Sequence, residues 1–342
     1  MPLTQSLIRF EEAMEKVYGP FERIPGDTIA KWIPPPKSGG HKGRYLWTDA
    51  FGVVNFLTLH HETSCTRYLH LAKSLAENVH NILGWERDGK SRLPGATDKE
   101  PLKGGLRIGK VDATGTDGDG QYHHYLTLWM FALNRLSIAT KDKEYNTKAI
   151  TLAKAIHPHF VIKSGNTPRM VWKISSDMKK VLVPSEGHLD AATGYVVCRL
   201  LQDRDGSDTL KDEIADYKEV MEEEGKLTAS KDPLDLGMAL WMCHFFREEE
   251  WAADLGKKCI SNSTMLLKER GGLFDRPPYS RLAFREFGTT LGVKCFSRDE
   301  YLDKRADDVV KFWGDEMTGA TPEDLKPITL VMYAAALIPG GE

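Results

Sequence analysis

Carboxylates and histidines gather where apolar helical segments are expected to begin. In segment 185–190, Glu186 and Asp190 are four residues apart, which puts them on one face of a helix with His188 between them. Carboxylates held near a histidine and apolar walls can have well-separated pKa values, as general acid/base catalysis requires. An aspartate at a helix start is also a common N-cap, and that alternative stays open for Asp49. The predicted catalytic residues are Asp49 and Asp190 first, followed by Asp119, Glu186, His123 and His188.

Two adjacent histidines lie in a second segment, where the sequence reads Gln-Tyr-His-His-Tyr from residue 121. His123 is the candidate for chemistry, because Asp119 and Gln121 lie close to it in the chain. His124 points about 100° away around a helix, so we expect a structural role for it.

Basic and aromatic residues in the same segments predict how a substrate is held. Arg107, Lys110, Lys173 and Arg285 together suggest a pocket that accepts a carboxylate or phosphate, although each could also be a solvated surface charge. Trp47 and Trp172 lie in expected loops and could stack on a ring. The predicted substrate-binding residues are Trp47, Arg107, Lys110, Gln121, Tyr122, Trp172, Lys173, Arg285 and Glu286.

Composition excludes several classes of protein. The 342 residues are 41% hydrophobic and 28% charged, as in ordinary globular proteins. A net charge of −3, from 46 basic and 49 acidic residues, gives no electrostatic footprint for nucleic acid. The longest apolar run, 328–338, is too short for a membrane helix, and residues 1–19 do not form a signal peptide pattern. We therefore expect a cytoplasmic protein with a small-molecule substrate, and the sequence leaves the oligomeric state open.

No motif for a metal or a cofactor is present. The five cysteines are scattered without ligand spacing, which favours reduced thiols. The sequence has no dinucleotide or phosphate-binding glycine loop, no paired-histidine zinc motif and no nucleophile elbow. The glycine-rich stretch 115–120 has the composition of a calcium loop but not its ligand spacing. We expect no metal and no cofactor.

Two kinds of helical segment alternate along the chain. One kind is apolar on nearly all sides and must be buried, whereas the other is amphipathic and should cover it. The apolar segments are 48–59, 121–137, 188–201, 234–246, 285–296 and 326–338, and the amphipathic ones are 3–17, 65–83, 144–160, 209–224, 250–269 and 300–313. Six inner and six outer helices predict an all-α protein, an (α/α)6 barrel that forms a single domain over residues 1–342. Residues 169–183 could add one short hairpin.

Three long connections, residues 19–47, 84–120 and 161–187, precede the first three inner segments. Long connections in compact domains usually carry function, whereas those inside the helical hairpins are short. We therefore expect the active site at the end where the inner helices begin.

Several stretches resemble the six-hairpin glycosidase-like superfamily, and they span nearly the whole chain. They are LWTDAFGVVNFLTL, GGLRIGK, DGQYHHYLTLWMFALNRLS, PRMVWKISSDM, VPSEGHLDAATGY and SRLAFREFG. The superfamily includes glycoside hydrolases, unsaturated uronyl hydrolases, N-acylglucosamine 2-epimerase-like isomerases and polysaccharide lyases. The resemblance implies carboxylates at the starts of inner helices, at positions such as Asp49 and Asp119. It also implies, for the epimerase branch, two histidines as acid and base, for which His123 and His188 are the candidates.

The leading prediction is a glycosidase-like hydrolase that acts on a small sugar or sugar-like substrate, an anionic one included, by carboxylate acid/base catalysis. An isomerase, lyase or cyclase that uses histidine and aspartate is the second prediction. A non-catalytic binding protein is the third.

Overall fold

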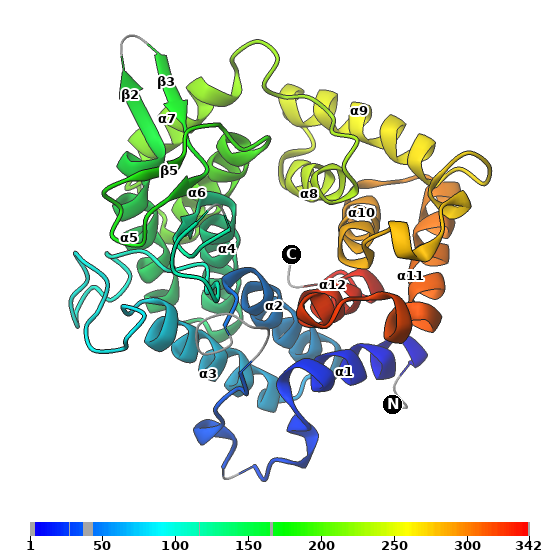
Figure 1. Cartoon of the computed structure of the whole chain (residues 1–342), viewed down its shortest axis with the longest axis horizontal. Coiled ribbons are helices and arrows are strands. Elements are labelled where there is room, and N and C mark those ends of the chain that lie inside the picture. Colours follow the sequence, from blue (N-terminus) through cyan, green and yellow to red (C-terminus); the bar gives the residue numbers. More distant parts are fainter. Residues whose placement is uncertain (1–3, 27, 37–43, 116, 165–166, 341–342) are drawn as a thin grey trace. The chain divides into compact units, whose positions relative to one another are not determined.

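The computed structural model describes residues 4–26, 28–36, 44–115, 117–164 and 167–340. This part of the chain contains twelve α-helices and five short strands (Figure 1). The helices are α1 (Gln5–Tyr18), α2 (Leu46–Thr63), α3 (Thr66–Leu83), α4 (His123–Thr140), α5 (Lys143–Phe160), α6 (Asp190–Asp205), α7 (Lys211–Met221), α8 (Pro233–Cys243), α9 (Glu250–Leu267), α10 (Ala283–Phe296), α11 (Glu300–Ala320) and α12 (Lys326–Leu337). The strands are β1 (Gln121–Tyr122), β2 (Val161–Ser164), β3 (Thr167–Met170), β4 (Lys173–Ile174) and β5 (Val181–Val183).

The chain divides into two compact units. One consists of Met1–Val17 and Glu224–Pro339, and the other of Tyr18–Glu223 and Gly340–Glu342. We call them the α8–α12 unit and the α2–α7 unit. The prediction of a single domain stays a prediction.

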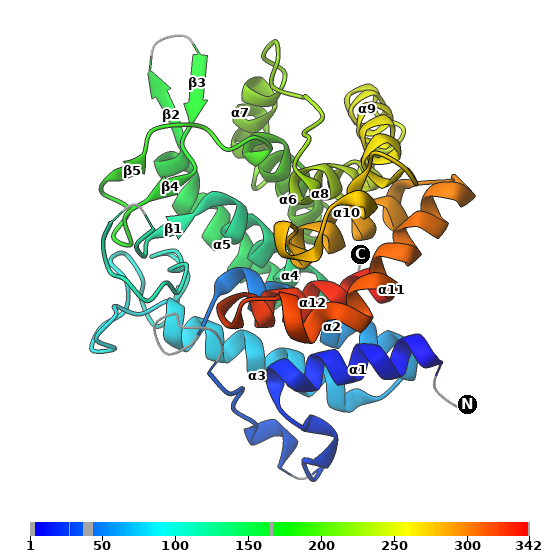
Figure 2. The ribbon, with the colours of Figure 1, turned by 45° about the vertical axis from the view of Figure 1, so that its right-hand side comes forward.

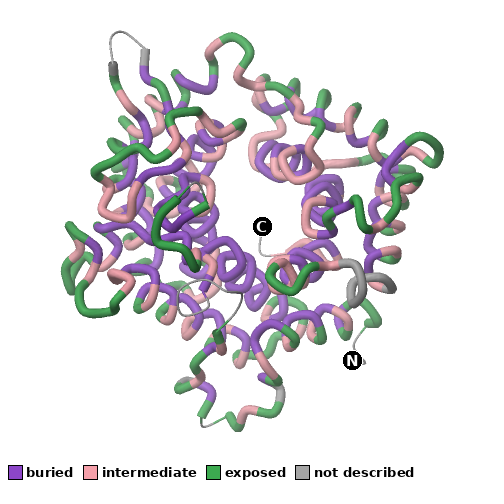
Figure 3. The backbone as a smooth tube through the Cα atoms, viewed as in Figure 1, coloured by how far each residue is buried: buried purple, intermediate pink, exposed green. Residues whose placement is uncertain are grey.

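The α2–α7 unit consists of three helical hairpins, in which α2 pairs with α3, α4 with α5 and α6 with α7. The helices α2, α4 and α6 also contact one another in that order. Every residue of α2 from Leu46 to Leu59 is buried, and α4 is nearly as deeply buried (Figure 3). An evenly apolar helix becomes stable only when neighbours cover it on most sides, and this explains why the amphipathic α3 and α5 lie against α2 and α4.

The connections differ in length on the two sides of each hairpin, as predicted. The turns after α2 and α4 are two residues long, and each begins with a left-handed residue, Ser64 or Lys141. The segments that lead into α2, α4 and α6 are much longer, and they carry all five strands. Strands β1, β4 and β5 form a small antiparallel sheet, while β2 and β3 form a hairpin that projects beyond the helices of its unit (Figures 1 and 2). The predicted hairpin over 169–183 corresponds to β4 and β5.

Two of the differences between predicted and observed helix starts affect the site. Helix α6 begins at Asp190 rather than at residue 188, so Glu186 and His188 precede the helix and do not share a helical face with Asp190. Residues Gln121 and Tyr122 form β1, and α4 begins at His123. Before α4 the segment pairs with another connection, since the N–H of His123 donates to the carbonyl of Trp172. Before α6 a turn takes the place of the predicted helical residues, with the N–H of Asp190 3.5 Å from the carbonyl of Gly187.

The α8–α12 unit repeats the arrangement. Here α8 pairs with α9 and α10 with α11, while α10 also contacts α8 and α12. The backbones of α8 and α10 touch, because a Cβ added at Gly237 would lie 1.9 Å from the carbonyl oxygen of Gly288. Glycine is therefore required at this crossing. Within the described residues no helix of either unit is long and apolar enough to cross a bilayer.

Candidate functional site

The starts of α2, α4 and α6 meet in the α2–α7 unit. The indole of Trp47 on α2 lies 5.6 Å from the His124 ring and 5.3 Å from the Tyr125 ring, measured between centroids. On the other side, Nδ1 of His124 is 3.9 Å from Oδ1 of Asp190, the first residue of α6. Three helices thus contribute to one group of side chains, at the end of the unit where the long connections enter.

Five aromatic rings lie together at the starts of α2 and α4 and in the segment before α6. We call them the aromatic cluster: Trp47, Tyr122, His124, Tyr125 and Trp172. The His124 ring stacks on Tyr122 with an interplanar angle of 29°. Trp172 lies 4.8 Å from Tyr122 and donates a hydrogen bond from Nε1 to the hydroxyl of Ser185, 3.1 Å away. Aromatic side chains have flat apolar faces and polar edges. They can stack on the apolar face of a ring-shaped ligand and form hydrogen bonds with its hydroxyl groups.

The two histidines differ sharply in exposure. The His123 side chain is fully buried, whereas 37% of the His124 side chain is exposed. The geometry therefore favours His124 as the histidine that meets a substrate, which reverses the roles expected from the sequence. The catalytic role of His123 remains a prediction, and its buried ring can act only through a neighbour.

Asp190 lies between the two imidazoles. Its Oδ1 is 3.8 Å from Nδ1 of His123 as well as 3.9 Å from that of His124. Oδ2 of Asp190 and Nδ1 of His123 are buried, and no hydrogen-bond partner for either atom exists among the described residues. A Cβ at Gly187 would lie 2.2 Å from that Oδ2, so glycine makes room for the carboxylate. Buried polar atoms without a hydrogen-bond partner are uncommon in folded proteins, so Asp190 and His123 are candidates for a functional role.

Burial sets the protonation of the cluster. It lowers the pKa of His124 below 6.5, although the Asp190 carboxylate acts in the opposite direction and His123 adds to the lowering. Burial also raises the pKa of Tyr122 to about 12 and that of Tyr125 further still. Near neutral pH the site therefore offers an uncharged imidazole beside protonated phenols.

Glu186 and His188 lie in the segment before α6. Glu186 is partly buried and accepts a hydrogen bond from the N–H of Met170, 3.3 Å away, while His188 is exposed. Both precede Asp190 closely in the chain, so they are near the site, and their catalytic roles stay predictions.

Asp49 is engaged in a buried ion pair. Its two oxygens lie 3.1 and 3.0 Å from Nη1 of Arg44, and the Tyr18 hydroxyl donates to it at 3.0 Å. The Arg44 guanidinium also donates to the carbonyls of Pro34 and Pro35. These contacts tie the first long connection to α2, so the geometry favours a structural role for Asp49.

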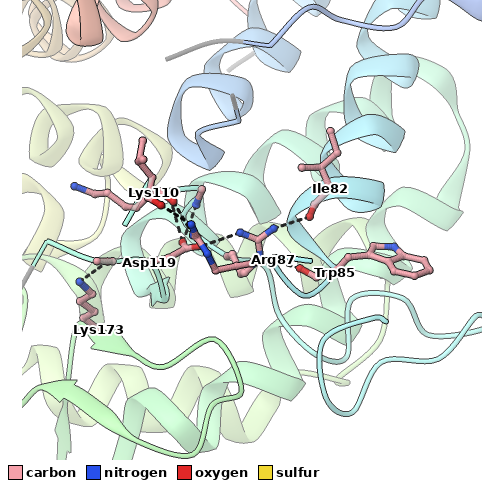
Figure 4. A network of polar contacts seen from close by, with 10 residues as sticks. Ile82, Trp85, Arg87, Lys110, Asp119 and Lys173 are labelled. Atoms are coloured by element: carbon pink, nitrogen blue, oxygen red, sulfur yellow. Dashed lines mark hydrogen bonds and ion pairs between the residues drawn. The ribbon is translucent and has the colours of Figure 1, made fainter. Parts of the chain in front are cut away.

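Asp119 has a similar environment (Figure 4). Its Oδ2 accepts from Arg107 at 2.7 Å and from Arg87 at 2.8 Å, while Oδ1 accepts from the N–H groups of Gly109 and Lys110. Arg107 is fully buried and also donates to carbonyls of Ile82 and Trp85, at the end of α3. The carboxylate is paired with two guanidinium groups, and this favours a structural role for both Asp119 and Arg107.

The other predicted binding residues of this unit hold the connections together. The Gln121 amide accepts from the N–H of Leu106 and donates to the carbonyls of Gly104 and Ser176. Lys110 is paired with Asp117. Lys173 donates to the carbonyl of Gly118 at 2.8 Å, with its ammonium 5.0 Å from the Tyr122 ring centroid, and burial lowers its pKa.

Arg285 and Glu286 belong to the α8–α12 unit. Arg285 is paired with Asp232, whose other oxygen caps α8 by accepting from Leu234 and Asp235. Glu286 is buried, accepts from Arg281 at 2.8 and 2.6 Å, and also accepts from Nε1 of Trp313. Both side chains already have strong protein partners.

Sequence reasoning missed Tyr125, which contacts both Trp47 and His124. The second tyrosine of the Gln-Tyr-His-His-Tyr run was the available signal.

No protein-family model matches the chain, and the search of curated proteins gives no match. Solved structures do match over almost the full length. A D-mannose isomerase matches with a TM-score of 0.61 and 12% identity, over 98% of this chain and 99% of its own. A sugar epimerase from a ruminal bacterium matches with a TM-score of 0.59 and 12% identity, over 96% of this chain and 98% of its own. A glycoside hydrolase family 76 α-mannanase of Bacteroides thetaiotaomicron matches with a TM-score of 0.63 and 11% identity, over 97% of this chain and 94% of its own. At these identities the likeness concerns the fold, and it confirms the predicted all-α (α/α)6 barrel.

Proposed function

We propose that this chain, with the fold of the six-hairpin glycosidase-like superfamily, is an enzyme that isomerises or epimerises a small neutral sugar. Support comes from the solved structures that share the fold, since they include a D-mannose isomerase and a sugar epimerase. An α-mannanase shares it too, so the choice between reactions depends on the side chains of the site.

The observation that carries the proposal is the pairing of a partly exposed, uncharged histidine with a carboxylate inside the aromatic cluster. Nδ1 of His124 faces Asp190 at 3.9 Å, which leaves Nε2 as the nitrogen that can accept a proton. The separation exceeds a hydrogen bond, and such contacts often tighten only when substrate binds. A neutral imidazole with a lowered pKa is suited to act as a general base near neutral pH.

In the proposed reaction His124 removes the proton from the carbon next to the sugar carbonyl, and the electron pair of that C–H bond forms the enediolate. Return of the proton to the carbonyl carbon, together with transfer of the neighbouring hydroxyl proton to the former carbonyl oxygen, gives the isomer. Return of the proton to the original carbon after the enediolate has turned its other face toward His124 gives the epimer. Asp190 orients His124 through Oδ1, which faces Nδ1 of that ring.

A neutral substrate follows from the partners of the basic residues. Arg107 is paired with Asp119, Lys110 with Asp117 and Arg285 with Asp232, and Lys173 donates to a carbonyl. An anion would have to displace these partners. We therefore favour an uncharged sugar over the anionic one that the sequence suggested.

The test is proton exchange. Mannose, glucose and fructose are incubated separately with the protein in D2O, and NMR follows both deuterium at C2 and the appearance of a second sugar. We expect exchange with at least one of them, reduced by about 10²–10⁴-fold in His124→Gln and Asp190→Asn. His61→Gln, which changes a side chain that is 82% exposed, is the control and should behave as the wild type. Exchange that survives His124→Gln, or no exchange in the wild type with any of the three, would overturn the proposal.

Glycoside hydrolysis is the second candidate, because Oδ2 of Asp190 has no hydrogen-bond partner in the described part of the chain and Glu186 closely precedes it. A glycosidase needs two carboxyl groups flanking the bond, and Asp49 and Asp119 are both bound to arginine. Aryl mannosides distinguish the candidates. A hydrolase would release the phenol, lose activity in Asp190→Asn and Glu186→Gln, and retain it in His124→Gln.

A further inference from the structure

A tyrosine lies behind the site, on the outer helix α7. The Tyr217 hydroxyl is 2.9 Å from Nε2 of His123, and both side chains are almost completely buried. The two rings meet edge to face at 5.5 Å between centroids. Helix α6 leaves room for the phenol, because a Cβ at Gly194 would lie 2.6 Å from Cε1 and Cζ of Tyr217.

The direction of the hydrogen bond follows from the two ends of the imidazole. Burial, together with nearby negative groups that include Asp190, raises the pKa of Tyr217 well above 10, so its hydroxyl keeps its proton. A buried O–H needs an acceptor, and Nε2 of His123 lies in position to be one. On the opposite side of the ring, Nδ1 faces Oδ1 of Asp190 at 3.8 Å.

The reverse arrangement is unfavourable at both ends. If Nε2 carried the proton and donated to Tyr217, the phenolic hydrogen would lose its acceptor inside the protein. The lone pair of Nδ1 would then face a carboxylate across 3.8 Å with no proton between them. Two polar groups would be left unsatisfied in a buried place, which is costly.

We propose that Tyr217 is a positioning residue that fixes His123 as the Nδ1–H tautomer, so that this N–H steadies the Asp190 carboxylate beside His124. The consequence for catalysis rests on the proposed function, whereas the tautomer itself does not. Tyr217 does not touch the substrate in this arrangement. It acts through His123 and Asp190, over a path that runs from α7 through α4 to α6.

Other titratable groups around His123 must be considered in any pH measurement. These are His124 on its own helix, Asp190 on α6 and Tyr217 on α7, and from α5 His157 affects it electrostatically. Burial lowers the pKa of His157 to about 4, so it is uncharged at neutral pH. Phe160 of α5 covers another side of the ring, 5.2 Å away.

The experiment is NMR of the whole protein labelled with ¹⁵N-histidine, with His123→Gln used to assign the His123 signals. The wild type should show a protonated Nδ1 and an unprotonated Nε2 for His123 at neutral pH. In Tyr217→Phe the population of the Nε2–H form should rise, because the hydroxyl donor is gone. Gly194→Ala, which displaces the phenol while retaining its hydroxyl, should change the tautomer in the same direction.

Tyr145→Phe is the matched control, since Tyr145 is a buried tyrosine of another outer helix, α5. It should leave the His123 tautomer unchanged. Activity adds a second readout: we expect kcat to fall about 3- to 10-fold in Tyr217→Phe with KM little changed, as for the loss of one hydrogen bond. A wild-type Nε2–H tautomer, or a tautomer that is the same in Tyr217→Phe, would overturn the proposal even if the sugar reaction is confirmed. A protein without isomerase activity that shows the expected tautomers would refute the proposed function and retain this inference.

Discussion

The adjacent histidines of α4 show how much one helical step changes the chemistry of a residue. His123 points into the unit, where it contacts Phe160 and Tyr217, and it has no exposed surface. His124 belongs to the aromatic cluster, where it contacts Trp47, and part of its side chain is exposed to solvent. Both lie near one carboxylate, that of Asp190, which couples them.

The first prediction concerns the titration of His124. Because burial lowers its pKa, we expect the ring to protonate only below pH 6.5. The Asp190 carboxylate raises that pKa, so Asp190→Asn should move the midpoint to still lower pH. The midpoint is measured from the His124 ring signals in NMR spectra collected between pH 8 and 4.

The exposed variant Asp88→Asn is the control and should leave that midpoint in place. A His124 midpoint above 6.5, or one that rises in Asp190→Asn, would contradict the assignment of His124 as a neutral base.

The second prediction concerns stability and His80 of α3. Burial lowers the pKa of this histidine to about 3, and its Nε2 accepts a hydrogen bond from Nε1 of Trp129. A lowered folded-state pKa means that the stabilisation is complete above about 6.5 and is lost as pH falls from there toward 3. His80→Gln keeps an acceptor but cannot bind the proton. Its free energy of unfolding should therefore depend less on pH, by up to about 1.4 kcal/mol per pH unit.

Urea unfolding between pH 8 and 5 measures this slope. The reference is the difference in the free energy of unfolding between the wild type and His80→Gln at pH 8, where the histidine is neutral in the folded and the unfolded state. Parallel curves for the two proteins below pH 6.5 would show that His80 is not the group responsible.

At the scale of elements, arginine–carboxylate pairs help to hold the first two long connections in place. Arg107 and Arg87 converge on Asp119 in the second connection, and Arg44 holds Asp49 next to the first. Buried charges of this kind need one another, because the loss of one leaves the other without compensation. The connections are thus fixed in place beside the helix starts that form the site.

The third prediction tests this role. Asp119→Asn should lower the free energy of unfolding by about 3–5 kcal/mol, because the buried Arg107 loses its counter-charge. The exposed Asp88→Asn, from the Lys90–Asp88 pair, should cost less than about 1 kcal/mol. Urea unfolding measures the free energy of unfolding of both variants. Equal small losses in the two would mean that the ion pairs of Asp119 contribute little to stability.

The contact between α8 and α10 depends on glycine. Gly237 meets the carbonyl of Gly288, and a Cβ at Gly292 would lie 2.0 Å from the carbonyl of Gly237. Backbone cannot move aside as a flexible side chain can.

The fourth prediction is that Gly237→Ala lowers the free energy of unfolding by about 1–3 kcal/mol through overpacking. Gly26→Ala is the matched control, since a Cβ there would meet nothing within 4 Å, and we expect a change within about 0.5 kcal/mol. Thermal unfolding compares the two, and an unchanged Gly237→Ala protein would mean that the two helices can separate without cost.

At the scale of the whole molecule, alternation of apolar and amphipathic helices runs through both units. The predicted single domain leads to a fifth prediction: calorimetry should record one unfolding transition. Asp119→Asn in the α2–α7 unit and Gly237→Ala in the α8–α12 unit should each shift that same transition. Two transitions, each sensitive to only one of the variants, would mean that the chain folds as two domains.

Much of the fold could be predicted from the sequence, because hydrophobic periodicity is a local property. A segment such as 48–59, apolar on every side, has to be buried whatever surrounds it, and the helix α2 bears this out. The long connections and the apolar alternation also predicted that the site lies where the inner helices begin, and this stays a prediction. Helix boundaries were less certain where strands precede the helix, as at His123.

The site was harder to predict, because the state of a charged side chain depends on partners that are distant in the chain. Asp49, Asp119 and Asp190 look equivalent in the sequence, since each lies at or near an expected helix start. Tertiary structure gives arginine partners to the first two, whereas one oxygen of the third has no hydrogen-bond partner among the residues that the structure describes. Tyr217 is 94 residues away from His123, and no pattern in the sequence connects them. The sequence by itself determined which helices are inside, because burial follows from the period of apolar residues. Only the tertiary structure decided which acids and histidines are available for chemistry, because pairing, desolvation and exposure are set by neighbours that folding brings together.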